Sequence, residues 1–182
     1  EIEAMKKRLT WSVIFLIPTM YIAMHQMFSM WFGLPVPAVV AEFFDGKENA
    51  ISFAFSQFLL ILPILYLNKK YFINGFKNLY HGAPNMDSLV GLGSAASALF
   101  GVFAIFRMGY GLGHGDMLLV EEYSKNLYFE SAGTIVTLIT VGKYLEAKAK
   151  GSTSEALKKL MSLAPKTAKV IRDGEEVEIS VE

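Results

Sequence analysis

Three side chains could bind a soft metal ion: the thioether of Met86 and the carboxylates of Glu130 and Glu146. A thioether suits a soft cation such as Cu⁺, and a carboxylate beside it adds attraction without tight capture. The chain has no cysteine, which excludes disulfides and thiolate zinc sites. Soft-metal chemistry here must therefore rest on methionine, histidine or carboxylate groups.

The two carboxylates cannot share one ion. Glu130 and Glu146 are sixteen residues apart on one predicted helix, a separation of about 24 Å at 1.5 Å per residue. Met86 opens the preceding apolar segment, which must cross a membrane in the opposite direction. We therefore expect Met86 and Glu146 to meet at one mouth, with Glu130 at the other. The alternatives stay open: Met86 could pack at a helix start, and either glutamate could be an interfacial carboxylate in contact with water.

The elements that would position these residues are long apolar segments. Apolar residues make up 53% of the chain while 19% are charged, a mixture that suits apolar blocks separated by charged ones. A membrane-crossing helix needs roughly 20 residues. After a lead-in of residues 1–10 we predict a membrane domain of residues 11–146 with four spans, and Pro18 is a candidate bend in the first. The spans are residues 11–30, 50–67, 88–106 and 127–146.

The basic residues predict the orientation. Lysine and arginine gather before the first span, between the second and third, and after the fourth, and such charge favours the cytosolic side. We therefore predict an integral membrane protein, of the plasma membrane, with both termini in the cytosol. The formal net charge is zero, which offers nothing to attract a nucleic acid. The opposite loops are richer in acidic residues: Glu42, Asp45, Glu48, Asp116, Glu121 and Glu122.

The connection of residues 68–80 has the pattern of an amphipathic helix lying in the membrane interface. Its apolar residues fall at helical spacing on one face, and Lys69, Lys70 and Lys77 lie largely elsewhere. A tight cytosolic loop is the alternative.

Residues 147–182 predict a cytosolic helix followed by a β-hairpin. We expect Gly151 to break the helix, with Ser152 and Glu155 forming a capping box for a restart that ends at Pro165. Residues 167–172 and 175–182 alternate around Asp173-Gly174, a strong hairpin signal. An isolated hairpin is marginally stable, so we expect it to begin a truncated domain.

Three stretches are recognisable together. Residues 81–93 read HGAPNMDSLVGLG, residues 128–132 read YFESA, and residues 142–150 read GKYLEAKAK. They closely resemble the third and fourth spans of heavy-metal-transporting P-type ATPases, and the NMDSL form is similar to the copper-exporting branch. Residues 153–170 resemble the lead-in to the actuator domain of that family. The similarity covers nearly the whole chain and is specific from about residue 75 onward.

The resemblance implies ATP-driven export of Cu⁺ through an aspartyl-phosphate cycle, with ATP and Mg²⁺ bound by other parts of the full-length protein. Met86 and Glu146 would match the cytosolic residues that receive copper, and Glu130 the exit carboxylate. Residues 69–80 would match the platform where a copper chaperone docks. The further partners implied are the lipid bilayer and the rest of the pump: actuator, phosphorylation and nucleotide-binding domains and further transmembrane helices.

The chain also departs from the family pattern. Asn68-Lys69-Lys70 stands where relatives often carry a glycine pair, which puts a sharp kink there in doubt. The Thr-Gly-Glu motif, the Cys-Pro-Cys transport helix and the phosphorylated aspartate are absent from this sequence, so we expect the fragment alone to be inactive. Two rivals remain: the same pump class moving Zn²⁺, Cd²⁺ or another divalent ion, and a non-catalytic four-helix membrane adaptor.

Overall fold

The computed structural model describes residues 1–181 and divides into two compact units, Glu1–Gly142 and Lys143–Glu182. Seven α-helices and one 3-10 helix precede a β-hairpin in the described part of the chain. The elements are α1 (Ile2–Phe32), α2 (Ala38–Phe44), η1 (Lys47–Asn49), α3 (Ala50–Leu67), α4 (Lys69–Tyr80), α5 (Met86–His114), α6 (Met117–Lys125), α7 (Phe129–Ser162), β1 (Thr167–Arg172) and β2 (Glu175–Ser180).

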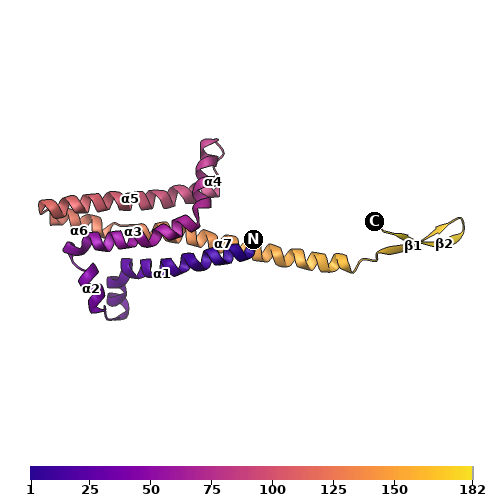
Figure 1. Cartoon of the computed structure of the whole chain (residues 1–182), viewed down its shortest axis with the longest axis horizontal. Coiled ribbons are helices and arrows are strands. Elements are labelled where there is room, and N and C mark those ends of the chain that lie inside the picture. Colours follow the sequence, from indigo (N-terminus) through magenta and orange to yellow (C-terminus); the bar gives the residue numbers. More distant parts are fainter. Residues whose placement is uncertain (182) are drawn as a thin grey trace. The chain divides into compact units, whose positions relative to one another are not determined.

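The first unit is a helix bundle in which α1 packs beside α3 and α3 beside α5 (Figure 1). The beginning of α7 completes its interior, because Phe129 and Ala132 are fully buried with Ile61 of α3. The ring of Phe129 fits over Gly101 of α5, where a Cβ would collide with it. Small residues on α5 thus let neighbouring helices approach closely.

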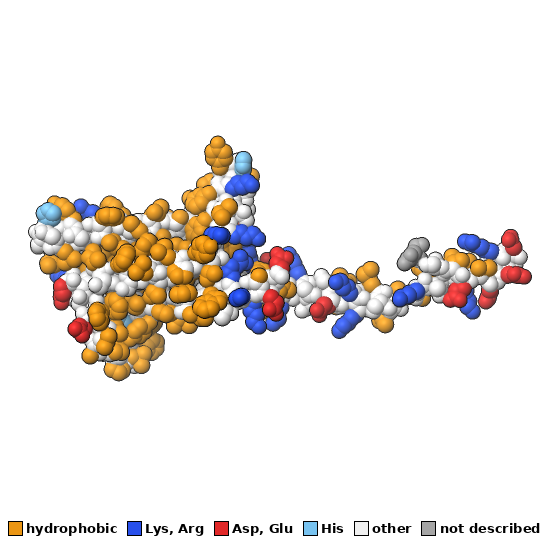
Figure 2. Space-filling model, in the orientation of Figure 1, with side chains coloured by type: hydrophobic (Ala, Val, Ile, Leu, Met, Phe, Trp, Pro, Cys, Tyr) orange, Lys and Arg blue, Asp and Glu red, His pale blue; other side chains and the backbone are white. Residues whose placement is uncertain are grey.

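Within residues 1–181, three helices are long and apolar enough to cross a membrane: α1, α3 with its preceding turn, and α5. Their outward faces carry large exposed apolar side chains such as Ile17, Leu99 and Phe106, and apolar side chains cover most of the visible face of the bundle (Figure 2). An apolar surface of this extent is stable in lipid and unfavourable in water. The predicted second span has the bounds of α3, and the third lies within α5.

The segment predicted as the fourth span, at the start of α7, does not reach the hydropathy of the other three. It contains threonines at three-residue spacing, and each hydroxyl lies within hydrogen-bond distance of the carbonyl oxygen four residues earlier: Thr134 of Glu130, Thr137 of Gly133 and Thr140 of Val136. Thr137 and Thr140 are buried. The polar atoms that lower the hydropathy are therefore hydrogen-bonded and, for these two, turned into the bundle.

The chain breaks its helix between α3 and α4 at Asn68, whose backbone has φ −105° and ψ 22°. The buried Asn68 amide nitrogen donates to the hydroxyl of Ser12 on α1 at 3.0 Å and to the carbonyl of Ile64 at 2.8 Å. The Asn68 side-chain oxygen accepts from Thr140 of α7 at 2.6 Å. The Thr140 hydroxyl also lies 2.8 Å from that of Tyr71 on α4. We call these four side chains, Ser12, Asn68, Tyr71 and Thr140, the elbow network.

The α4 helix leaves the direction of α3 after this elbow and packs against the start of α5 (Figure 1). Their closest approach is at Gly75, where a Cβ would collide with the backbone of Asp87. The hydroxyl of Ser88 donates to the Gly75 carbonyl at 2.7 Å. The helix axis thus bends at residue 68 although no glycine occupies residues 68–70. The buried side chain of Asn68 stabilises this bend.

The predicted break at Gly151 is wrong. The α7 helix runs through Gly151 to Ser162 without a break, because a single glycine costs only about 1 kcal/mol in a helix of otherwise good helix formers. The α1 helix likewise continues without interruption through Pro18. The cap of α5 is Asn85, which forms a capping box with Ser88.

The second unit ends in the predicted β-hairpin. Strands β1 and β2 pair antiparallel from Thr167 opposite Ser180 to Arg172 opposite Glu175. Asp173 and Gly174 both have positive φ, 54° and 82°, as the two central residues of a type I′ turn require. The Asp-Gly prediction is therefore confirmed, and Glu182, the last residue of the predicted second strand, lies outside the described residues.

The elbow network predicts an effect of Thr140→Val. Valine keeps the side-chain shape but leaves the buried Asn68 oxygen without its donor. We expect the free energy of unfolding to fall by about 1–2 kcal/mol, measured by thermal unfolding of the intact protein in detergent. Thr137→Val is the matched control, because the Thr137 hydroxyl donates to the carbonyl oxygen of Gly133 in its own helix. An equal loss in both variants would contradict the role of the network.

The α4–α5 contact predicts that Gly75→Ala is destabilising. The added methyl group must push α4 away from the backbone at Asp87, and overpacking of this kind costs about 1–3 kcal/mol. Faster proteolysis within α4, together with a lower melting temperature, should report it. Gly109→Ala on α5 is the control because open space surrounds that position; the prediction fails if the two variants behave alike.

Candidate functional site

Met86 is the first residue of α5, at the end of the bundle where the N-terminus and α4 also lie (Figure 1). It is 61% exposed. The backbone beneath it is fixed, since the Ser88 amide donates to Asn85 Oδ1 at 3.1 Å and the Asn85 amide donates to Ser88 Oγ at 3.2 Å. Met86 therefore presents an accessible thioether at a capped helix start, which argues against simple core packing.

Glu146 belongs to the second unit and lies on the exposed part of α7. Its side chain is 61% exposed and pairs with Lys150 one turn later, at 2.8 Å. Exposed pairs at this spacing contribute about 0.3–0.5 kcal/mol, so Lys150 holds the carboxylate only weakly. The Glu146 carboxylate is thus available to a cation. That it lies close to Met86 stays a prediction.

Glu130 lies in the first turn of α7, next to the buried Phe129, whose ring lies against Gly101, fifteen residues along α5 from Met86. One turn along the helix, the Thr134 hydroxyl contacts the sulfur of Met20 on α1 at 3.8 Å and the carbonyl oxygen of Glu130 at 2.6 Å. The structure places the Met20 thioether one helical turn from the predicted exit carboxylate.

The three lysines predicted to form a docking platform are exposed on α4. The Lys69 ammonium lies over the ring of Tyr66 at 4.8 Å from its centroid. Tyr71 and Gly75 form the buried side of α4. The helix thus combines a packed face with accessible cations, and the described charges on it are all positive: Lys69, Lys70 and Lys77.

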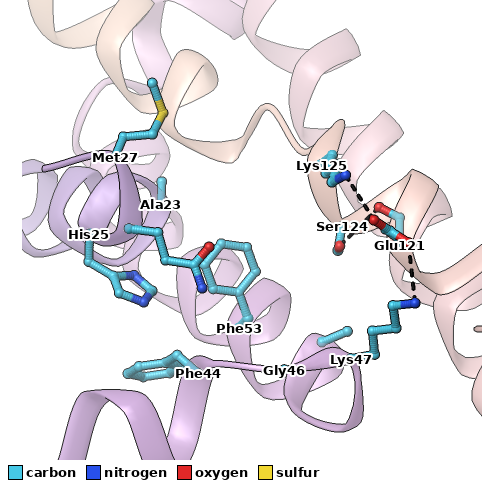
Figure 3. A pocket seen from close by; sticks show the side chains of 12 residues that line it. Ala23, His25, Met27, Phe44, Gly46, Lys47, Phe53, Glu121, Ser124 and Lys125 are labelled. Atoms are coloured by element: carbon cyan, nitrogen blue, oxygen red, sulfur yellow. Dashed lines mark hydrogen bonds and ion pairs between the residues drawn. The ribbon is translucent and has the colours of Figure 1, made fainter. Parts of the chain in front are cut away.

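A pocket of about 390 Å³ opens at the other end of the bundle between α1, the segment before α3, and α6. Lys47 and Lys125 lie on either side of Glu121 at 3.2 Å and 2.9 Å (Figure 3). Hydrogen bonds from Lys125 and then Lys47 lower the pKa of Glu121 below its usual value. This carboxylate therefore ties α6 to the turn before α3.

His25 of α1 lines the same pocket and is buried. Its Nε2 lies 2.6 Å from the Asp45 carboxylate and its Nδ1 lies 2.8 Å from the carbonyl oxygen of Ile22. Both partners only accept hydrogen bonds, so the ring satisfies both when both nitrogens carry protons. The side chain of Met27 points away from His25 (Figure 3), and the pocket does not pair a thioether with an imidazole.

Among residues 1–181 there is no group of three or more histidine, cysteine, aspartate or glutamate side chains able to hold a metal ion. Methionine is not one of these four residue types, so this statement does not cover the thioethers of Met86 and Met20. The described features that sequence reasoning missed are the elbow network and the contact between Met20 and Thr134. The one sequence signal for them was the regular threonine spacing inside an apolar segment.

No protein-family model matches the chain. Copper-transporting ATPase 1 of Rhizobium meliloti is 35% identical over 185 residues, and Copper-transporting ATPase 2 of the same organism is 34% identical over 182 residues. Each alignment covers 100% of this chain and 20% of the relative. A copper-exporting P-type ATPase of Staphylococcus aureus is 36% identical over 124 residues, which cover 68% of this chain and 14% of the relative.

The chain spans about a fifth of the length of the first two curated relatives. Its apolar helices agree with the membrane location that a transport ATPase requires, so it is an integral membrane protein. Homology over the whole chain shows that it belongs to the family of copper-transporting P-type ATPases.

Proposed function

We propose that the protein containing this chain exports Cu⁺ from the cytosol across the plasma membrane with energy from ATP, and that this chain forms both ends of the ion path. The observation that carries the proposal is the similarity, over the whole chain, to proteins named as copper-transporting ATPases. ATP, Mg²⁺ and the phosphorylated aspartate belong to other parts of the protein. The chain alone hydrolyses no ATP.

The proposal includes four spans, with α7 as the fourth. In support, the α7 threonine hydroxyls are hydrogen-bonded to carbonyl oxygens of the helix, which lowers the cost of placing them in hydrocarbon. Basic residues gather before α1, along α4 and after residue 142, so both termini lie in the cytosol.

The cytosolic mouth is formed by Met86 and Glu146. Met86 offers a thioether to a soft ion from a capped helix start. Glu146 adds negative charge and gives up only a weak exposed pair with Lys150. One thioether and one carboxylate bind an ion only weakly. The ion can therefore leave this mouth and move along the path. Glu130 acts at the exit, where the Met20 thioether one turn away offers a second soft ligand.

The α4 platform receives a copper chaperone, and the second unit leads into the actuator domain. Exposed lysines attract an acidic partner surface. In the second unit, β1 and β2 expose apolar side chains such as Ile171 and Val177, and a two-stranded sheet needs further strands for stability. The hairpin is therefore the first part of a larger β domain.

The mouth predicts the behaviour of two variants of the full-length pump. Met86→Ala and Glu146→Ala should each lower Cu⁺-stimulated ATP turnover by about tenfold, the effect of losing about 1.4 kcal/mol of interaction, whereas Met30→Ala should not. Met30 is the matched control, since it is a methionine that is 80% exposed on α1. Lys150→Ala controls for loss of the Glu146 ion pair and should stay active.

The same assay separates the rival functions. Turnover stimulated by Zn²⁺ or Cd²⁺ in place of Cu⁺ would favour a divalent-ion pump, and no turnover with any of the three would favour a membrane adaptor. Wild-type activity in both mouth variants would refute the assigned mouth while leaving the pump class standing.

The platform predicts a different defect. Lys69→Gln, Lys70→Gln and Lys77→Gln together should slow copper transfer from a chaperone with an acidic face by about tenfold at low salt, measured as Cu⁺ delivery to the pump. High salt should reduce the difference. Turnover driven by free Cu⁺ should be unchanged, and Lys125→Gln, on α6, should transfer copper normally. A defect with free Cu⁺ as well would count against a docking role.

A further inference from the structure

An apolar groove of about 480 Å³ lies between α1 and α3, near the N-terminal end of the bundle. Trp11 and Phe15 line it from α1, with their rings stacked at 6.3 Å between centroids. Pro63, Tyr66 and Leu67 line it from α3. The two helices run in opposite directions, so both present apolar groups toward the bilayer interior and their aromatic rings near its surface, as interfacial residues do.

Two basic residues close the groove at its N-terminal end. Lys7 and Arg8 line it one turn before Trp11, and neither has an ion-pair partner among residues 1–181. The Arg8 Nε is buried and has no hydrogen-bond acceptor within the described chain. A buried guanidinium nitrogen without an acceptor is costly, and because the protein encloses this nitrogen, an anion in the groove can pair only with the Nη groups at the end of the Arg8 side chain.

The surrounding charge is also positive. The ammonium of Lys69 lies over the Tyr66 ring, which is part of the groove wall. Glu3 lines an adjoining hollow together with Lys6 and Lys7, so two cations stand against one carboxylate there. The rim therefore presents cations to the outside, while the space behind it is apolar.

We propose that this groove binds one anionic phospholipid, with the phosphate against Arg8 and Lys7 and an acyl chain between Trp11, Phe15 and Pro63. A guanidinium matches the oxygens of a phosphate in geometry as well as charge. Basic pockets between membrane helices bind anionic head groups in this way. A free phosphate would leave the apolar space unfilled, and a neutral lipid would leave the cations unpaired. The site is independent of the ion transported.

The test is native mass spectrometry of the full-length pump in detergent with added phosphatidylglycerol or phosphatidylcholine. We expect one retained phosphatidylglycerol per pump to be lost, with at least about tenfold weaker binding, in Lys7→Gln/Arg8→Gln. Ala4→Phe, which fills the groove and keeps both charges, should displace the lipid equally. Lys77→Gln/Lys158→Gln removes the same charge from residues that do not line the groove and should bind as the wild type.

Each contrary result overturns the proposal. Equal retention of phosphatidylcholine shows that charge does not select the occupant. Loss in Lys7→Gln/Arg8→Gln without loss in Ala4→Phe shows attraction to a charged surface, with no seated acyl chain. Displacement of the lipid by millimolar inorganic phosphate assigns the site to the free anion. Because no readout uses copper or ATP, failure here leaves the proposed transport function untouched.

Discussion

The break in the backbone at Asn68 is the feature on which the cytosolic end of the bundle depends. Ending one helix and starting another inside an apolar bundle frees backbone groups that lipid cannot satisfy. The elbow network solves this locally, because the Asn68 side chain bonds the Ile64 carbonyl, the hydroxyl of Ser12 and the hydroxyl of Thr140. One asparagine therefore joins α1, the α3–α4 junction and α7.

The position of Met86 follows from that junction through a short chain of contacts. Tyr71 holds α4 to Thr140, Gly75 lets α4 approach α5, and Ser88 bonds the Gly75 carbonyl while capping α5 through Asn85. A change at the elbow would thus shift the helix that bears the platform lysines, together with the helix start that bears Met86. The same helix contacts therefore position both the platform and the mouth, which suits transfer of an ion from one to the other.

The sequence predicted the elements whose signals are local. The bounds of α3 follow from an uncharged apolar run, and the β1–β2 turn follows from Asp173-Gly174, since only a few residues accept positive φ at both positions. The partners of Asn68 could not be predicted, because they lie 56 and 72 residues away in the chain. The predicted helix break at Gly151 was wrong for the opposite reason. Glycine locally disfavours a helix, but the helix-forming residues around it keep α7 continuous. Of the candidate site, residue types and helix positions were predictable, whereas the contact of Met20 with Thr134 needs the packing of α1 on α7.

The low hydropathy of α7 and the apolar groove between α1 and α3 have a common physical origin. A helix surrounded by lipid must show apolar atoms, and α1 does so on most of its surface. A helix that faces other helices can carry hydroxyls and carboxylates, provided that each finds a partner, as the α7 threonines do. Buried polar side chains occur on the other long helices as well: Ser12, Thr19 and His25 on α1, Gln57 on α3 and Ser94 on α5. Charge is distributed differently, because α3 carries no charged side chain and the cations that line the groove, Lys7 and Arg8, lie near the start of α1, which is where the proposed lipid places its phosphate.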